Sequence, residues 1–367
     1  MSVARLRRIV VCSLEEWDDV WRRNQFLVDG LLRRDPDLRV LFVEPPSDLV
    51  HGALHGRLPT DPRLCRVRDR LWTLQPLKLL PRRAGPWADR ALVAQVRRAA
   101  RRLRFPQPTL WVNDSTYAPL AAAAGWPALY DVTDDWLLTR MSTRELARRR
   151  RLEEEMLRVA REVVVCSPTL VESRGRSRRV SLVPNGVDVD HFRLPRPRPA
   201  DLPASPTAVY VGTLHDERID VPLLEELARS SGPAVVLVGP DALSAASSRA
   251  LRLAGAHLFG PRPYADVPAY LQHADVVIVP HLVTPFTESL DPIKAYECLA
   301  AGRPTVATPV AGFRGLDGAI DVVPREAFVR AVDRALAERR DAAPPPAGID
   351  WEARVVAFES LLPRAAA

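Results

Sequence analysis

Short apolar runs, rich in β-branched residues, alternate along this chain with stretches in which apolar residues recur every three or four positions. Such runs, nearly continuous in Val, Leu and Ile, are typical of parallel strands that helices cover on both faces. Their alternation with helical patterns predicts stacked βαβ units. In the first half of the chain we expect strands at 7–13, 39–45, 109–114, 128–134, 162–168 and 180–186.

A proline-rich segment without periodicity, HFRLPRPRPADLPASP at 191–206, interrupts the pattern and predicts a semi-rigid linker. A further break at 341–348 precedes a last amphipathic helix at 350–362. Between the two breaks we expect a second series of strands at 207–213, 234–240, 257–262, 275–281, 304–309 and 320–324.

The predicted fold class is α/β, with two Rossmann-like, doubly wound domains facing a cleft. The domains are expected at 1–190 and 207–345, joined by the linker 191–206 and followed by a helical C-terminal segment at 346–367. Ligands of such sheets bind beyond the carboxyl ends of the strands. Residues that directly follow the apolar runs are therefore the candidates for chemistry.

Composition supports two globular domains, since 367 residues exceed one ordinary core. No apolar run approaches the roughly 20 residues that span a bilayer, and the first apolar stretch is shorter than a secretory signal requires. We therefore expect a cytoplasmic protein. Its four cysteines lack metal-ligand spacing and are expected to be reduced thiols.

Positive charge is the strongest bias, with a formal net charge of +7. Only Lys78 and Lys294 are lysines, so nearly all the basic residues are arginines, concentrated in helical patterns at 82–105 and 144–162. A solvated basic face explains both segments; the alternative is a surface toward an anionic membrane or acceptor. The chain lacks zinc spacing and interleaved aromatics, so nucleic acid is not an expected partner.

One of the two lysines lies in DPIKAYECLAAGRPTVATP, at 291–309. A helix is predicted to start near Asp291 and Pro292, with Asp as the cap and Pro in the first turn. Lys294 then lies where the helix dipole attracts an anion, and Glu297 follows on the same face, able to accept hydrogen bonds from a ribose diol. An ordinary surface ion pair, contributing about 0.3–0.5 kcal/mol, explains the spacing equally well.

The segment resembles the donor-binding signature of GT-B glycosyltransferases of the "group 1" type, D-P-x-K-x-x-E-x-L-A-x-G-x-P-V-V-A-T. Four other stretches resemble the same family in the expected order: VLFVEPP (40–46), LYDVTDDW (129–136), VPNGVDVDHF (183–192) and GPRPYADVPAYLQHADVVIVP (260–280).

The resemblance implies a GT-B fold whose C-terminal helix crosses back to the N-terminal domain. It also implies a UDP-, GDP- or dTDP-linked sugar donor and neither a metal nor a cofactor. Lys294 would hold the donor diphosphate and Glu297 the ribose. The remaining donor-binding residues would be Gly212, Thr213 and Leu214 near the phosphates, and Arg262 and Tyr264 near the base.

Many relatives carry a first glutamate eight positions before the second, but that position is Ser289 here, and Glu288 stands one place early. That acid usually helps to orient the donor sugar, so the sugar is left unidentified. His215 and His281 also follow predicted strands and are candidates to line the cleft; a hydrogen-bonded structural histidine is the plainer interpretation of each.

The N-terminal domain is expected to bind the acceptor and to supply a base. Asp134 and Asp135 follow a strand, and a carboxylate there suits removal of a hydroxyl proton, although acids at this position also cap the next helix. Arg22 and Asn24 follow the first strand and are candidates to contact acceptor or phosphate, unless they simply begin an amphipathic helix.

The sequence thus predicts a metal-independent glycosyltransferase that moves a sugar from a nucleotide diphosphate to a hydroxyl on a lipid-linked glycan, a polysaccharide or a small metabolite. It is expected in the cytoplasm, with peripheral contact of the basic N-terminal domain at the inner membrane face. The alternatives are a GT-B epimerase acting on the nucleotide sugar, and a non-catalytic protein that binds nucleotide sugars or polyanions.

Overall fold

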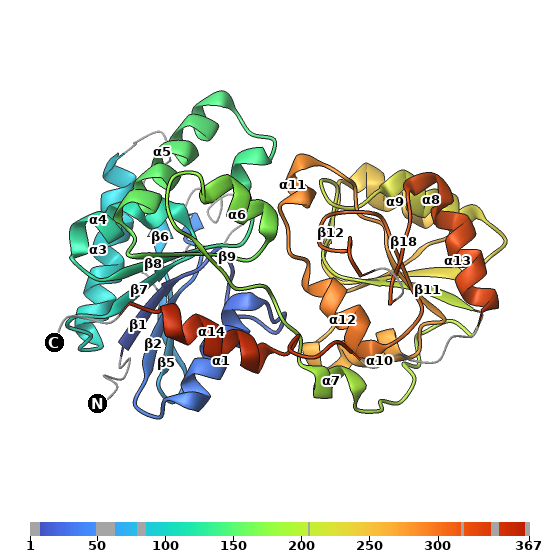
Figure 1. Ribbon diagram of the computed structural model, residues 1–367, viewed down its shortest axis with the longest axis horizontal. Coiled ribbons are helices and arrows are strands. Elements are labelled where there is room, and N and C mark those ends of the chain that lie inside the picture. The colour runs from blue at the N-terminus through green and yellow to red at the C-terminus, as the bar shows by residue number, and fades with distance from the viewer. Residues whose placement is uncertain are drawn as a thin grey trace. The chain divides into compact units, whose positions relative to one another are not determined.

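The computed structural model describes residues 8–48, 63–78, 86–204, 206–316, 319–338 and 345–363. The chain divides into two compact units. The first comprises 1–18, 23–184 and 354–367, and the second comprises 19–22 and 185–353. Each unit is built on one twisted sheet (Figure 1). The predicted α/β class, with two doubly wound sheets, is confirmed.

The sheet of the first unit has eight strands in the order β10-β9-β8-β7-β1-β2-β5-β4. All neighbouring pairs are parallel except β4 and β5 at one edge. The strands are β1 (Arg8–Cys12), β2 (Arg39–Val43), β4 (Arg63–Arg68), β5 (Leu71–Gln75), β7 (Thr109–Val112), β8 (Ala128–Val132), β9 (Glu162–Val165) and β10 (Ser181–Leu182). A separate pair joins β3 (Ser47–Asp48) to β6 (Leu77–Lys78).

Helices cover both faces of this sheet, which is why its central strands, such as β1 and β2, are apolar at nearly every position (Figure 1). Val10 and Cys12 pack in one core cluster with side chains of the helices on one face, namely α3 (Pro86–Arg102), α4 (Ala118–Ala124) and α5 (Thr143–Val159). On the other face lie α1 (Arg23–Arg34) and the end of α14 (Trp351–Leu361), where the rings of Trp111 and Phe358 are 4.6 Å apart.

The segment from Arg354 onward groups with the first unit although the chain reaches it from the second. Gly30 of α1 accommodates it closely, because a Cβ built there would lie 2.4 Å from a methyl of Val355. Arg34 and Glu359 form an ion pair between the two helices. The segment 341–344 of the predicted proline-rich break lies outside the described residues.

The sheet of the second unit has six parallel strands in the order β15-β13-β11-β16-β17-β18. They are β11 (Thr207–Val211), β13 (Ala234–Val238), β15 (His257–Gly260), β16 (Val276–Val279), β17 (Thr305–Ala307) and β18 (Asp321–Val322). A small pair joins β12 (Leu214–His215) to β14 (Asp241–Ala242). The helices are α7 (Val189–Arg193), α8 (Val221–Arg229), α9 (Ala245–Leu253), α10 (Val267–Gln272), α11 (Pro285–Glu288), α12 (Ile293–Ala301) and α13 (Phe328–Ala337).

The sequence predicted a semi-rigid linker at 191–206; in the structure this segment groups with the second unit, whose main part begins at Asn185. Phe192 and Leu202 are buried in that unit's core. The carboxylate of Asp201 accepts hydrogen bonds from Arg262 and Tyr270. Proline lacks a backbone N–H donor, but it does not prevent neighbouring apolar side chains from packing in a core. The sequence pattern therefore did not show that Phe192 and Leu202 are buried.

Among the described residues, no helix is both long and apolar enough to cross a bilayer.

Candidate functional site

Two glycines at the carboxyl ends of neighbouring strands form the floor of the candidate site in the second unit. Gly212 follows β11, and Gly239 follows β13. A Cβ built on Gly239 would lie 2.0 Å from the carbonyl oxygen of Gly212, so only glycine fits there. A Cβ on Gly212 would lie 2.8 Å from the hydroxyl of Tyr210 and 3.1 Å from Cε of Lys294. The absent side chains therefore let Lys294 lie directly against the backbone of this loop.

Lys294 and Glu297 come from the first turn and a half of α12. The ammonium of Lys294 donates a hydrogen bond to Glu297 Oε2 at 2.5 Å. Glu297 is 5% exposed, whereas the Lys294 side chain is 26% exposed. A buried carboxylate thus holds a cation that still reaches solvent at the positive end of the helix. This arrangement suits a diphosphate, which needs both the charge and the free N–H groups of the first turn.

The helix begins one residue later than the sequence predicted. Pro292 is its N-cap, and no side chain caps it. Asp291, predicted as the cap, instead accepts hydrogen bonds from the backbone N–H of Asn185 and the hydroxyl of Tyr296. Gly312 packs against the proline, since a Cβ there would lie 2.1 Å from Pro292 Cδ. Asp291 therefore fixes the entry of α12 and leaves the N–H groups of the first turn without a side-chain competitor.

His281, predicted as lining the site, is buried directly after β16. Its Nε2 lies 3.5 Å from the Tyr210 hydroxyl, and its Nδ1 has no hydrogen-bond partner among the described residues. Burial, with the charges of Arg218 and Lys294, lowers the pKa of His281 to about 3. The ring is therefore neutral at physiological pH and adds no charge beside Lys294.

Arg262 and Tyr264, the two residues predicted to lie near the nucleotide base of the donor, have different surroundings. The Arg262 guanidinium donates to the Tyr270 hydroxyl, to the Phe259 carbonyl and to Asp201, so it braces the segment before β11. Tyr264 stacks on His191 with ring centroids 4.4 Å apart. Burial and the nearby charge of Glu297 raise the pKa of Tyr264. Tyr264 therefore lies within electrostatic range of Glu297, whereas the Arg262 side chain is engaged with Asp201 and Tyr270.

The remaining candidates of the second unit differ in exposure. Glu288 is ion-paired to Arg314 and accepts from the backbone N–H of Ala311. Ser289 is fully buried and donates to the Phe286 carbonyl. Of the residues after β11, Thr213 and His215 are exposed, and Leu214 is buried. Glu288 therefore anchors the loop after β17, and Thr213 is the exposed residue next to Gly212.

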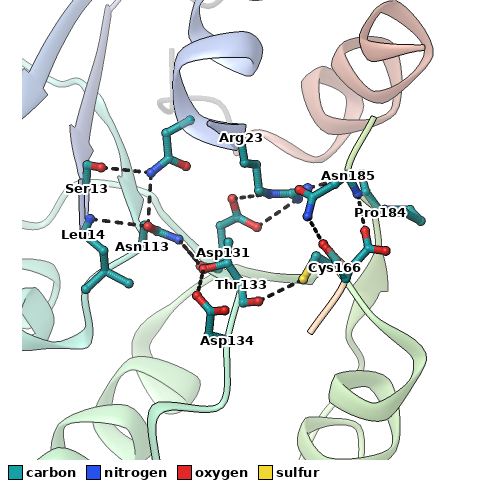
Figure 2. Close-up of polar contacts among 12 residues, drawn as sticks. Ser13, Leu14, Arg23, Asn113, Asp131, Thr133, Asp134, Cys166, Pro184 and Asn185 are labelled. Atoms are coloured by element: carbon teal, nitrogen blue, oxygen red, sulfur yellow. Dashed lines mark hydrogen bonds and ion pairs between the residues drawn. The ribbon is translucent and has the colours of Figure 1, made fainter. Parts of the chain in front are cut away.

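In the first unit, the carboxyl ends of β1, β7 and β8 carry a buried polar network (Figure 2). Arg23 donates to both carboxylate oxygens of Asp131 at 3.1 Å, and to the Pro184 carbonyl. Asn24, predicted to contact acceptor or phosphate, is 1% exposed and donates to Ser13 and Asn113. These contacts make Arg23 and Asn24 structural ties at the start of α1.

Arg22 lies in the short segment 19–22, which groups with the second unit. Its Nη1 donates to the carbonyl of Val20 at 2.9 Å. Neighbouring positions in the sequence thus have different surroundings: Arg22 is half-buried in one unit and Asn24 is buried in the other.

The two candidate bases are held in contrasting ways. Asp135 is 7% exposed, caps the short helix at 136–138, and forms an ion pair with Arg174, which also binds Glu153. Asp134 is half-buried, accepts from the Thr133 hydroxyl at 3.2 Å, and lines a small pocket with Trp136 and Arg149, among others. Asp135 is thus held in a buried salt bridge, and Asp134 is the half-buried carboxylate that lines the pocket.

Electrostatics reinforce this assignment. Burial would lower the pKa of Arg174, but its hydrogen bond to Asp135 and the charges of Glu153 and Asp135 together raise it. Burial raises the pKa of Glu153, although Arg174 opposes the shift. The cluster is therefore a structural ion network around a permanently charged arginine.

Comparisons with known proteins show which families and folds the chain resembles. Residues 205–338 match the family model described as glycosyl transferases group 1. A Bacillus subtilis protein named as a teichuronic acid biosynthesis glycosyltransferase, TuaH, is 26% identical over 218 residues, which are 54% of this chain and 55% of that protein. The resemblance to group 1 glycosyltransferases is confirmed. The matched region spans about half the length of this relative.

The fold likeness extends over nearly the whole chain. A sucrose-phosphate synthase from Thermosynechococcus elongatus superposes with a TM-score of 0.70 at 19% identity, covering 97% of this chain and 95% of that one. An α,α-trehalose-phosphate synthase (UDP-forming) from Burkholderia vietnamiensis gives 0.66 at 14% identity, covering 98% of both chains. The fold is GT-B. The comparisons favour neither the epimerase nor the non-catalytic alternative.

Sequence reasoning missed several residues of the second unit's site. Gly239 follows a strand just as Gly212 does, and this shared position was the available signal. Tyr210 lies inside a strand, and Arg218 in a loop without a motif, so neither position indicated an interaction with His281. The register of β11 against β16 brings Tyr210 toward His281, and the bridge between Ile219 and His281 brings the charge of Arg218 near it.

Proposed function

We propose that this protein is a glycosyltransferase that moves a sugar from a nucleotide diphosphate to an acceptor hydroxyl. The observation that carries the proposal is the Lys294–Glu297 pair on the first turns of α12, with Lys294 against Gly212. As the bond between the anomeric carbon and the diphosphate breaks, negative charge grows on the leaving group. Lys294 and the N–H groups of α12 meet that charge, and Glu297 accepts hydrogen bonds from the ribose hydroxyls.

The donor site is tested by titrating the protein with UDP, GDP and dTDP and measuring thermal stabilisation. We expect one nucleotide to raise the melting temperature, and Lys294→Ala to abolish the rise. Lys78→Ala is the matched control, because it removes the other lysine of the chain. Stabilisation that survives Lys294→Ala at full strength would contradict the proposal.

Transfer also requires removal of the acceptor proton, and we assign that step to Asp134. Its carboxylate accepts the hydroxyl proton as the acceptor oxygen bonds to the anomeric carbon and the diphosphate departs with the bonding electron pair. Asp134 lines a pocket, whereas Asp135 is held by Arg174. Asp134→Asn should lower kcat by about 10²–10⁴-fold. Asp135→Asn should reduce stability more than kcat. The reverse pattern would move the role to Asp135.

The acceptor in this proposal is a glycan, either lipid-linked or a growing polysaccharide, rather than a small metabolite. Support comes from the name of the Bacillus relative, which places that protein in teichuronic acid biosynthesis. Radiolabelled donor incubated with a membrane extract should label a glycan fraction, with Lys294→Ala as the blank. Label found only in small soluble products would overturn this assignment.

The reaction in this proposal needs no metal and no cofactor, because Lys294 and α12 supply the positive charge at the diphosphate. Activity should survive treatment with EDTA. Loss of activity that added Mg²⁺ or Mn²⁺ restores would refute metal independence.

We also propose that the protein works in the cytoplasm, with the basic N-terminal domain at the inner membrane face. Fractionation should then divide it between the cytosol and salt-washable membranes.

A further inference from the structure

The amino ends of the strands in the first unit carry a second charged feature. Arg8 begins β1, so it lies at the opposite edge of the sheet from Ser13 and Asn113, which follow β1 and β7. Five residues of extended chain separate the two edges by about 15 Å. Whatever this edge binds is therefore distinct from the carboxyl-end network of the same unit.

A hollow of about 530 Å³ opens at this edge. We call it the amino-edge groove and define it by its main lining residues: Arg8, Arg97, Arg101, Arg104, Gln107 and Trp126. None of the described residues that line it is Asp or Glu. Its volume falls within the range of ordinary small-molecule pockets, about 300–1,000 Å³.

The side chains of the four arginines of the groove have no hydrogen bond or ion pair with other residues in the described part of the chain. Nε of Arg8 is buried without an acceptor. Some other arginines of this unit are ion-paired, as Arg148 is to Asp89 and Arg68 is to Asp29. A buried N–H donor without an acceptor costs about 1–3 kcal/mol, so the groove lacks an acceptor that a ligand can supply.

The backbone gives an independent indication. Helix α3 ends with Arg104 in the left-handed region, at φ 57°. The backbone N–H of Phe105 closes the turn by donating to the Ala100 carbonyl. Glycine is the usual residue at such a helix end, because it adopts positive φ without steric cost. Strained non-glycine residues tend to cluster at ligand clamps.

The chemistry of the groove selects its ligand. Planar guanidinium groups pair with phosphate oxygens through two parallel N–H bonds, and several converging on one hollow favour multiple negative charges. Trp126 and the buried ring of Phe105 add an apolar wall. We propose that the amino-edge groove binds a phosphate-bearing anion, either the headgroup of an anionic lipid or a free phosphate or diphosphate.

This site is separate from the donor site of the proposed function, and its test does not depend on that function. Pyrophosphate is titrated calorimetrically into Lys294→Ala, which removes the donor-site cation. Two double variants on this background share the helix and the charge change: R97Q/R101Q removes lining arginines, and R98Q/R102Q removes exposed arginines of the same turns that do not line the groove. We expect R97Q/R101Q to weaken pyrophosphate binding at least about tenfold and R98Q/R102Q to change it little.

Vesicle co-sedimentation distinguishes the two sources of phosphate. Vesicles of phosphatidylcholine alone are compared with vesicles that also contain phosphatidylglycerol, using the same variants. Binding to the anionic vesicles alone, lost in R97Q/R101Q and kept in R98Q/R102Q, identifies a lipid headgroup. Selective loss of pyrophosphate binding identifies a soluble phosphate. Equal loss in both variants would show a diffuse basic surface and overturn the proposal, as would failure of the parent protein to bind either probe.

Discussion

The two units share a doubly wound architecture but use the carboxyl ends of their strands differently. In the first unit this edge carries charged side chains locked to one another, such as Arg23 with Asp131 and Arg174 with Asp135. In the second unit it carries glycines, Gly212 and Gly239, and one partly exposed lysine. The first edge is thus held together by ion pairs, and the second leaves room for a ligand.

Charged residues at the carboxyl ends of the strands thus have two different roles in this protein. A buried ion pair costs desolvation and is stable only when both partners are present. A cation at a helix start, with its carboxylate buried and its own side chain partly exposed, is held ready for an outside anion. The ion-paired charges of the first unit, Arg23 with Asp131 and Arg174 with Asp135, should therefore matter mainly for stability, and Lys294 in the second unit mainly for turnover.

The largest expected effect is on the first unit. Arg23→Met removes the partner of Asp131, which is fully buried, and should destabilise the protein by about 3–5 kcal/mol. Urea denaturation measures this loss. The double variant R23M/D131L should recover part of it, because no buried charge remains. If Arg23→Met changes stability by less than about 1 kcal/mol, the pair behaves like a surface salt bridge and the comparison fails.

The second prediction concerns the other edge. Lys294→Ala should lower kcat by about 10²–10³-fold, equivalent to about 3–4 kcal/mol of transition-state stabilisation. It should also lower the free energy of unfolding by about 1–3 kcal/mol, because it leaves the buried carboxylate of Glu297 without its partner. Steady-state kinetics and urea denaturation are run on the same preparation, with Lys78→Ala as the control. A large loss of stability with kcat retained would make Lys294 structural instead.

A third prediction follows from the neutral His281. Its folded pKa of about 3 lies below the unfolded value near 6.5, so the folded state resists protonation. The contribution of neutral His281 to the free energy of unfolding is fully present above pH 6.5 and is lost as the pH falls toward 3. By pH 5 the loss should reach about 2 kcal/mol relative to pH 7.

The stability difference between pH 7 and pH 5 tests this directly. His281→Gln cannot titrate, so its difference should be smaller than that of the wild type by about the same 2 kcal/mol. His215→Gln, at an exposed position, is the control. An unchanged difference in His281→Gln would mean that the ring takes up a proton without cost.

The sequence predicted the fold in detail because the parallel strands are buried on both faces and their apolar runs are unmistakable. It did not predict the antiparallel edge of β4 and β5, where RLCRVRDRLWTLQ spreads four arginines over 63–75 and hides the strand pattern. It also placed a linker at 191–206, because proline content says nothing of whether Phe192 and Leu202 find a core.

The candidate site was predictable only where a motif is local. Lys294 and Glu297 lie three residues apart on one helix, so their spacing alone predicted the contact. Asp134 and Asp135 are adjacent in sequence, and only the distant Arg174 distinguishes them. Gly239 meets Gly212 through strand register, which a single sequence does not show.

The smallest effect expected is a gain of stability. Arg104→Gly relieves the left-handed backbone at the end of α3 and should stabilise the protein by about 1 kcal/mol, since glycine adopts this φ freely. The same change removes one cation of the amino-edge groove and should weaken pyrophosphate binding. A higher free energy of unfolding in urea denaturation, together with weaker pyrophosphate binding in calorimetry, would show that Arg104 contributes to binding at a cost in stability. If Arg104→Gly weakens both folding and binding, the side chain supports the helix end, and its conformation is no sign of a ligand.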